Sequence, residues 1–160
     1  MKKHLLLMAL ALVVNPIGIV KAQDYLSLSL GYFDVLDDED ALDIRAEYRF
    51  DHDIYYGVKP FIGAEVTTDA SLWLGAGIYR DFFVNDSVFI TPSFGAGYYA
   101  SGSSDLDLDS ALEFRSQIEA GYQFENKDRV SIGLSHISNA GIGSDNPGTE
   151  IVSVYYHIGF

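Results

Sequence analysis

The sequence contains no cysteine, so disulfide bonds cannot stabilise this fold. After residue 22 it also lacks any apolar run of about 18 residues or more, which excludes a transmembrane helix in that part of the chain. Basic residues are few, with 10 Lys and Arg against 23 Asp and Glu, and the formal net charge is -13. Contacts with phosphates need basic side chains, so this balance argues against a nucleic-acid partner.

The N-terminus has the pattern of a signal peptide. Two lysines precede an apolar run at residues 5–14, and residues 20–22 offer a cleavage site before the glutamine that follows. A buried N-terminal helix is the alternative, but nothing after this segment has helical periodicity. We therefore expect residues 1–22 to be a cleaved signal peptide and residues 23–160 to form one exported domain. Without disulfide bonds, a closed barrel in a membrane is one way to stabilise that domain.

Two segments alternate between apolar and polar residues with a period of two, as strands with two different faces do. The polar faces, at residues 42–50 and 112–124, consist of Asp43, Arg45, Glu47 and Arg49, and of Glu113, Arg115, Gln117, Glu119 and Gln123. So many charges cannot line an apolar protein core without a large desolvation cost. They can line the polar lumen of a membrane barrel whose outer face meets lipid. This pattern disfavours a soluble, lipocalin-like barrel.

Weaker alternation of apolar and polar residues in other segments brings the number of expected strands to eight. Their ranges are 25–35, 42–50, 55–66, 72–82, 88–99, 112–124, 129–138 and 150–160. The sequence thus predicts an all-β fold, an eight-stranded antiparallel transmembrane β-barrel of the outer membrane. Pro60 and Pro92 interrupt two strands, and we interpret them as bulge or strand-end positions because proline cannot donate to a ladder.

The connections between these strands also alternate in character. Those at 51–54, 83–87 and 125–128 are short and polar, whereas those at 36–41, 67–71, 100–110 and 139–149 tend to be longer. Bacterial barrels have short periplasmic turns and longer external loops, so both termini are expected in the periplasm. The final segment alternates up to Phe160, which resembles the C-terminal signature that the barrel assembly machinery recognises.

Three polar residues near the C-terminus interrupt an apolar outer stripe. In segment 129–138 the apolar residues must face lipid, and parity places His136 and Ser138 on that same face. Glu150 has the same parity in the last segment. These antiparallel neighbours bring all three to one end of the barrel, which is the external end by the loop argument. His157, in contrast, has lumen parity.

Polar groups that face lipid are costly and therefore require a reason. Each of the three alone would be an ordinary interfacial residue, but together they supply a nucleophile, a base and an orienting acid. In an esterase, Ser138 would attack a carbonyl, His136 would carry its proton, and Glu150 would orient the imidazole. Because the three face the membrane, their substrate would be an ester in the outer leaflet.

The same residues resemble a known family. The segment His136-Ile137-Ser138-Asn139-Ala140-Gly141, followed by Asn146 and Glu150, is similar to the His-x-Ser-Asn-Ala-Gly block of PagL-type lipid A 3-O-deacylases. The resemblance covers residues 133–160 and implies that His136, Ser138 and Glu150 are catalytic. It further implies that Asn139 and Asn146 support them, with Asn146 or amides around Gly141 forming the oxyanion hole. The implied substrate is the acyl ester at position 3 of lipid A.

Two other functions remain open at this stage. One is a non-catalytic barrel with a structural or adhesion role, and the other is an outer-membrane phospholipase. No motif requires a cofactor or a metal. Lipopolysaccharide and outer-membrane lipids are the expected partners, and the sequence leaves the oligomeric state open, a homodimer included.

Overall fold

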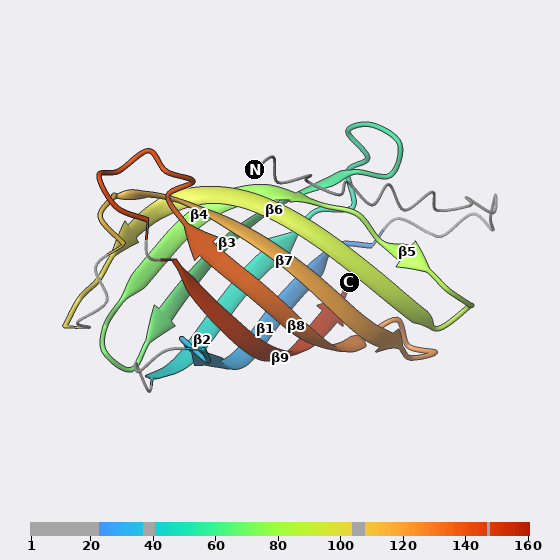
Figure 1. The fold of residues 1–160 in the computed structure, drawn as a ribbon. Coiled ribbons are helices and arrows are strands. Elements are labelled where there is room, and N and C mark those ends of the chain that lie inside the picture. Colours follow the sequence, from blue (N-terminus) through green and yellow to red (C-terminus); the bar gives the residue numbers. More distant parts are fainter. Residues whose placement is uncertain (1–22, 37–40, 104–107, 147) are drawn as a thin grey trace, which may run out of the picture.

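The computed structural model describes residues 23–36, 41–103, 108–146 and 148–160 (Figure 1). The expected signal peptide, residues 1–22, lies outside the described residues. The described residues form nine strands: β1 (Tyr25–Phe33), β2 (Ala41–Arg49), β3 (Lys59–Thr67), β4 (Leu72–Tyr79), β5 (Phe82–Phe83), β6 (Val88–Ala100), β7 (Leu112–Gln123), β8 (Arg129–Ser138) and β9 (Thr149–Gly159). In this described part, no helix has the length and apolar character needed to cross a membrane.

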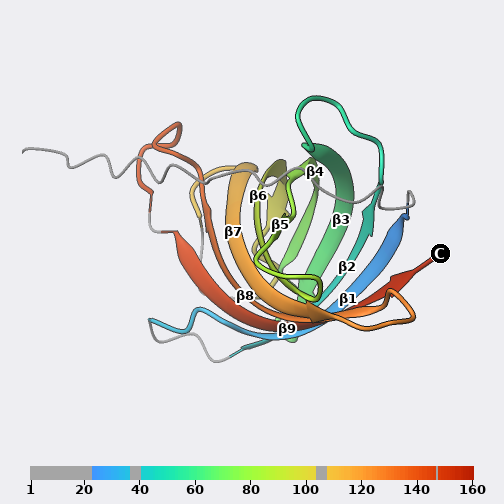
Figure 2. The same cartoon turned by 90° about the vertical axis from the view of Figure 1, so that its right-hand side faces the viewer.

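Eight of the strands close into an antiparallel barrel around a central lumen (Figure 2). Neighbours in sequence pair with each other, β4 pairs with β6, and β1 pairs with β9 to complete the ring. The closing register runs from Tyr25 opposite Gly159 to Phe33 opposite Ile151. The predicted eight-stranded barrel is therefore confirmed, and the ninth strand, β5, is a two-residue extension that pairs only with β6.

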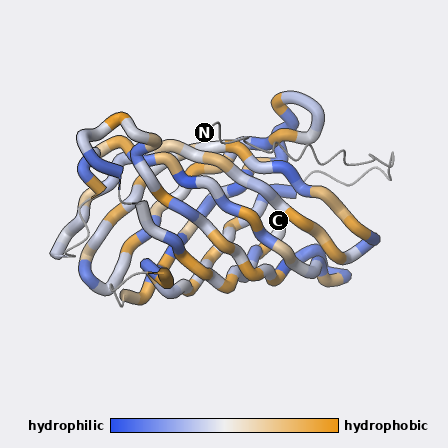
Figure 3. The backbone as a smooth tube through the Cα atoms, viewed as in Figure 1, coloured by the Kyte–Doolittle hydropathy of each residue, from blue (hydrophilic) through white to orange (hydrophobic). Residues whose placement is uncertain are grey.

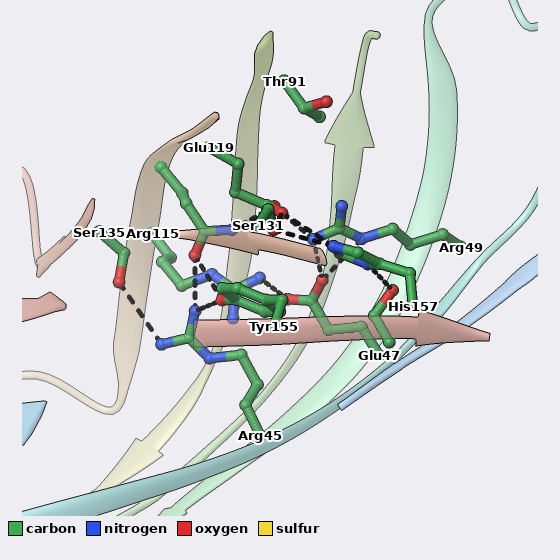
Figure 4. A network of polar contacts seen from close by, with 12 residues as sticks. Arg45, Glu47, Arg49, Thr91, Arg115, Glu119, Ser131, Ser135, Tyr155 and His157 are labelled. Atoms are coloured by element: carbon green, nitrogen blue, oxygen red, sulfur yellow. Dashed lines mark hydrogen bonds and ion pairs between the residues drawn. The ribbon is translucent and has the colours of Figure 1, made fainter. Parts of the chain in front are cut away.

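Hydrophilic and hydrophobic residues alternate along the strands (Figure 3), and buried and exposed residues alternate with the same period. All nine polar residues expected to line the lumen are buried, while the outward residues of the same strands are exposed apolar side chains such as Ile44 and Ile118. Inside, Arg45 pairs with Glu65 at 2.6 Å. Arg115 pairs with Glu47, as Figure 4 shows. These paired groups can be buried because they neutralise one another, whereas the buried Glu113 carboxylate has no hydrogen-bond partner among the described residues.

His157 lies in the lumen, as parity predicts, and is 1 % exposed. Its Nε2 lies 2.9 Å from the hydroxyl of Ser131, which also donates to Glu119 at 2.7 Å. Its Nδ1 lies 2.7 Å from the hydroxyl of Ser27. The imidazole is thus fully enclosed by the barrel wall and has no path to a substrate in the membrane.

The predicted start of the third strand was wrong. It begins at Lys59 rather than at residue 55, because Tyr56 and Gly57 adopt positive φ angles of 49° and 79° and form a tight turn. The connection between β2 and β3 therefore spans residues 50–58 and is longer than the one at 68–71 on the opposite side. The length of the connections consequently distinguishes the periplasmic end from the external end less clearly than the sequence suggests. The remaining strand limits agree within three residues of the predicted ones.

The two prolines occupy positions where no ladder donor is needed. Pro60 is the second residue of β3, as expected for a strand end. Pro92 lies inside β6 without a bulge, since its register with β7 is continuous. Its carbonyl accepts a bond from the Arg80 amide at 3.2 Å, on the side where pairing passes from β4 to β5. In a strand, the N–H and the C=O of one residue point to the same side. The N–H that Pro92 lacks would therefore point to the gap between the β4–β6 and β5–β6 ladders, where no strand residue needs it.

Candidate active site

A histidine and a glutamate face each other across the outer wall near one end of the barrel. His136 on β8 is directly opposite Glu150 on β9, and its Nδ1 lies 2.9 Å from the Glu150 Oε1. The His136 side chain is 43 % exposed and that of Glu150 is 27 % exposed, on the face that also carries Leu134 and Val152. Contact with Glu150 at Nδ1 leaves Nε2 of the imidazole free for a second partner.

Ser138 lies on the same strand and the same outer face, two residues beyond His136. The intervening Ile137 is fully buried and packs into the apolar cluster at this end of the lumen, which anchors the backbone between them. Two residues at positions i and i+2 of a strand lie about 6.6 Å apart along its axis. His136 and Ser138 can therefore meet only through their side chains. Among the described residues the Ser138 hydroxyl has no hydrogen-bond partner. Catalytic hydrogen bonds are often made only when substrate is present.

The turn after Ser138 is organised by Asn139. Its side-chain amide donates to the carbonyls of Leu108 at 2.9 Å and Asp145 at 2.7 Å, and its Oδ1 accepts from the Gly141 amide at 2.8 Å. Ala140 and Gly141 have φ angles of 54° and 78°, which makes a tight turn closed by an Ile142–Asn139 backbone bond. Asn139 is completely buried, and thus acts as the centre of the loop.

Asn146 returns toward this turn from the far side of the loop. Its Oδ1 accepts a bond from the Asn139 amide at 3.0 Å, so its side-chain NH₂ group remains available. The Gly141 amide, in contrast, is already taken by Asn139. Of the backbone amides in this turn, that of Ala140 has no partner among the described residues. The structure therefore places all the residues expected at the site in β8, β9 and the loop between them, and leaves two N–H donors of that loop without a partner among the described residues.

A second loop supports the first one. Asp109 accepts bonds from the Asp145 amide and the Ser144 hydroxyl, both at 2.8 Å, which links loop 101–111 to loop 139–148. These two donors stabilise the carboxylate and lower the pKa of Asp109. The sequence contained no signal for this contact, since its partners are 35 and 36 residues apart and lie in segments without a repeating pattern.

Gly148 was also missed from the sequence. It has a φ angle of 70°, and a Cβ at this position would lie 2.7 Å from Cε1 of His136 and 3.3 Å from its Nε2. Two features thus require glycine here, the left-handed backbone and the close approach to the imidazole. The Gly148 backbone limits where the ring can move, while Glu150 holds it from the other strand. The Pro-Gly pair in the sequence indicates only a turn.

Within the described residues, no group of three or more His, Asp or Glu side chains is placed to hold a metal ion. The polar groups at the site are instead an imidazole, a carboxylate, a hydroxyl and amides. This set suits acyl transfer, because it offers a nucleophile, a proton carrier, an orienting acid and donors for an oxyanion.

Comparison with known proteins gives related sequences and folds. The chain is 37% identical over 79 residues to the lipid A deacylase PagL of Pseudomonas aeruginosa, covering 48% of this chain and 46% of that protein. It is 32% identical over 84 residues to the lipid A deacylase PagL of Bordetella bronchiseptica, covering 52% and 42%. The matched segments therefore span less than half the length of either relative.

Solved structures share the fold. The crystal structure of the outer membrane enzyme PagL superposes with a TM-score of 0.65 at 24% identity, covering 84% of this chain and 98% of that chain. Neisserial surface protein A gives a TM-score of 0.53 at 10% identity, covering 86% and 96%. These likenesses support an outer-membrane barrel fold. The family model described as lipid A 3-O-deacylase (PagL) matches residues 63–158, more than half of the 160 residues, and the chain therefore belongs to the PagL family.

Proposed function

We propose that this protein is a serine esterase of the outer membrane that removes the acyl chain ester-linked at position 3 of lipid A. The observation that carries the proposal is the His136–Glu150 pair on the lipid-facing wall, with Ser138 beside it on the same strand. Membership of the PagL family and the relatives named lipid A deacylase support the choice of substrate.

In the proposed reaction, Ser138 is the nucleophile and His136 is the general base. As the Ser138 hydroxyl attacks the ester carbonyl, its proton passes to Nε2 of His136, the nitrogen that Glu150 does not contact. The tetrahedral intermediate expels the sugar alkoxide, which takes that proton. Water then attacks the carbonyl of the acyl-serine and gives a proton to Nε2 of His136. The second intermediate expels the Ser138 oxygen, which takes that proton back, and the fatty acid is released. Glu150 keeps Nδ1 protonated and stabilises the imidazolium.

The oxyanion needs donors that are not already engaged. We assign this role to the side-chain NH₂ of Asn146 and the backbone amide of Ala140, since the Gly141 amide donates to Asn139. Asn139 then acts as a positioning residue, because it holds both the turn and the Asn146 amide. Preorganised donors of this kind are worth about 10²- to 10³-fold each in rate.

The location of the site supports a substrate within the membrane. His136 and Ser138 lie on the face that also carries Leu134 and Ile132, which are exposed on the outside of the barrel. An ester dissolved in the external water would reach this face poorly. We place this end of the barrel in the outer leaflet, where lipid A is found, because loops 101–111 and 139–148 are the two longest connections between barrel strands.

Mass spectrometry of lipid A tests the proposal directly. Cells that express the intact protein are expected to lose one hydroxyacyl group from lipid A, and cells with Ser138→Ala are expected to keep it. Ser135→Ala is the matched control, since this serine lies on the same strand but its buried side chain points to the lumen. Loss of the acyl group with Ser138→Ala would rule out this nucleophile.

The alternatives give other results in the same assay. An unchanged lipid A spectrum with the folded wild-type protein would favour a non-catalytic barrel. Hydrolysis of glycerophospholipid vesicles, with lipid A left intact, would favour a phospholipase. Folding of each variant is checked by the shift in electrophoretic mobility on heating.

A further inference from the structure

The connection between β2 and β3 differs in character from the connection between β7 and β8, one of the other connections at the same end of the barrel. Residues 50–58 contain Ile54, Tyr55 and Tyr56, which are 55%, 70% and 71% exposed. The connection at 124–128, at the same end of the barrel, presents the polar residues Glu125, Asn126 and Lys127. Three large exposed apolar side chains in one loop require an explanation that a solvated turn does not provide.

This loop has a fixed shape. The Ile54 amide donates to the Val58 carbonyl at 2.8 Å, the Val58 amide donates to the Tyr55 carbonyl at 3.0 Å, and the Asp53 carboxylate accepts from the Gly57 amide at 3.0 Å. The rings of Tyr55 and Tyr56 pack edge to face, with centroids 4.2 Å apart. Tyr56 also holds a positive φ angle, which is uncommon for a bulky residue. The loop therefore presents its aromatic residues in a defined arrangement.

The loop projects sideways rather than along the barrel axis. In both Figure 1 and Figure 2 the segment between β2 and β3 extends away from the barrel wall, and Figure 1 shows that it lies at the end opposite loop 139–148. A loop that continued along the axis would enter the periplasmic water. A loop that leaves the wall sideways stays at the level of the membrane surface.

Aromatic residues on the adjacent wall mark that level. Tyr48 packs against Phe50, where the loop begins, with centroids 4.6 Å apart, and against Phe160 at 5.8 Å. Tyr122 and Phe124 form a similar pair further round the barrel. Aromatic girdles lie at the membrane–water interface of barrels. The loop thus starts inside the girdle and is continuous with the lipid-facing surface.

A cation lies next to the loop. Arg80 stacks on the ring of Phe82 at 4.7 Å, and a Cβ on Gly57 would lie 3.5 Å from its Nε. In the part of the chain that the structure describes, no carboxylate pairs with Arg80. A guanidinium at this depth is well suited to a phosphate group.

We propose that residues 54–56 insert among the phospholipid headgroups of the periplasmic leaflet, with Arg80 contacting a lipid phosphate. The loop would act as a lateral anchor that fixes the depth and tilt of the barrel in the leaflet opposite the candidate active site. This proposal requires that the barrel spans the membrane, and it is independent of the proposed esterase activity.

Because the chain has no cysteine, each introduced cysteine is a single labelling site. Tyr56→Cys and Tyr55→Cys, each carrying an environment-sensitive fluorophore, are reconstituted in vesicles of phosphatidylethanolamine and phosphatidylglycerol. Asn126→Cys is the matched control, since it lies in the polar connection at the same rim and faces the same compartment in either orientation. Folding is checked by heat modifiability.

The labels at positions 55 and 56 are expected to be quenched by lipids spin-labelled near the headgroup and protected from aqueous iodide. The label at 126 is expected to behave in the opposite way. Iodide quenching at 55 and 56 equal to that at 126 would place the loop in water and overturn the proposal. Protection from both quenchers would mean that protein, such as a second copy, covers the loop, and would overturn it as well.

A second comparison tests the cation. Arg80→Gln in the Tyr56→Cys background is expected to reduce quenching of the fluorophore by the spin-labelled lipid. The difference in quenching between the proteins with and without Arg80 is expected to become smaller when phosphatidylglycerol is omitted. Unchanged quenching in the Arg80→Gln protein would remove the phosphate contact from the proposal.

Discussion

His136 and Glu150 occupy directly opposed positions on β8 and β9, with Nδ1 and Oε1 2.9 Å apart. The register of two strands thus brings together residues 14 positions apart in the sequence. Both side chains point out of the barrel, so their contact is part of the wall that lipid touches. The pairing ties the orientation of the imidazole to the β-ladder itself rather than to a movable loop.

Glu150→Gln tests what this contact contributes. Glutamine keeps the size of the side chain but loses the charge that stabilises an imidazolium, and its amide can favour the wrong tautomer of His136. We expect the rate of lipid A deacylation to fall by about 10²- to 10⁴-fold, with little change in folding. Release of hydroxy fatty acid from purified lipid A measures this rate. A rate within twofold of the wild type would mean that Glu150 does not act through His136.

Gly148 gives a second test, because its backbone lies against the same ring. Gly148→Ala places a methyl group 2.7 Å from Cε1 of His136, and the ring must shift. A displacement of about 1 Å can lower the rate by about 10²-fold. We expect this loss in the rate at saturating substrate rather than in KM.

Gly57→Ala is the matched control for that variant. Gly57 has a φ angle of 79°, similar to the 70° of Gly148, so alanine meets the same backbone strain at both positions. Its nearest atom, however, lies at an ordinary 3.5 Å and belongs to Arg80 at the other end of the barrel. If both variants lost activity equally, strain in the fold rather than displacement of the imidazole would be the cause.

Much of this arrangement could be predicted from the sequence because a strand has a period of two. Alternation in residues 42–50 identified the lumen side of β2, and the same reasoning placed His136, Ser138 and Glu150 on one outer face. Parity works over long distances since every strand of a closed barrel has one polar and one lipid-facing side. The buried position of His157 follows from the same rule.

The contacts within the loops could not be predicted in this way. The bonds of Asn139 to Leu108 and Asp145 depend on how two irregular segments meet in space, and no period in the sequence describes that meeting. The late start of β3 has a similar origin, because Tyr56 adopts a left-handed backbone that its residue type does not favour. Local preference predicted a strand there, and the hydrogen bonds of the turn override it.

The contact between the two loops should depend on the charge of Asp109. Its carboxylate accepts from the Asp145 amide and the Ser144 hydroxyl, and these bonds lower its pKa below the usual 3.8. A lowered pKa in the folded state means that the link is fully present above pH 3.8 and weakens as the pH falls through the lowered value. Near neutral pH, Asp109→Asn is therefore expected to imitate acidification.

Hydrogen exchange measures this effect. We expect the Asp145 amide to exchange faster in Asp109→Asn than in the wild type at neutral pH. The Val88 amide, which the uncharged side chain of Asn85 holds at 2.8 Å, serves as an internal control at the other end of the barrel. Equal exchange of the Asp145 amide in both proteins would show that the loops stay together without this charge.

Removal of one partner of an ion pair in the lumen should lower the free energy of unfolding more than removal of both partners. Arg115 pairs with Glu47 and lies 4.5 Å above the ring of Trp73. In Arg115→Met, Glu47 keeps its 2.8 Å contact with Arg49 but loses one of its two counter-charges. Removal of one partner from a buried pair destabilises a protein by about 3–5 kcal/mol. Replacement of both, with Glu47→Leu, is expected to restore part of this loss, since the Glu47 carboxylate is removed together with its counter-charge.

Trp73 reports on this experiment directly, because it is the single tryptophan, is 1 % exposed and lies beneath the Arg115 guanidinium. Urea unfolding of the barrel in lipid vesicles, followed by Trp73 fluorescence, gives the free energy of unfolding of each variant. The single variant is expected to be the least stable of the three proteins. If it were as stable as the wild type, water would have to reach Glu47 and replace the guanidinium, and the lumen would be a hydrated channel rather than a packed polar core.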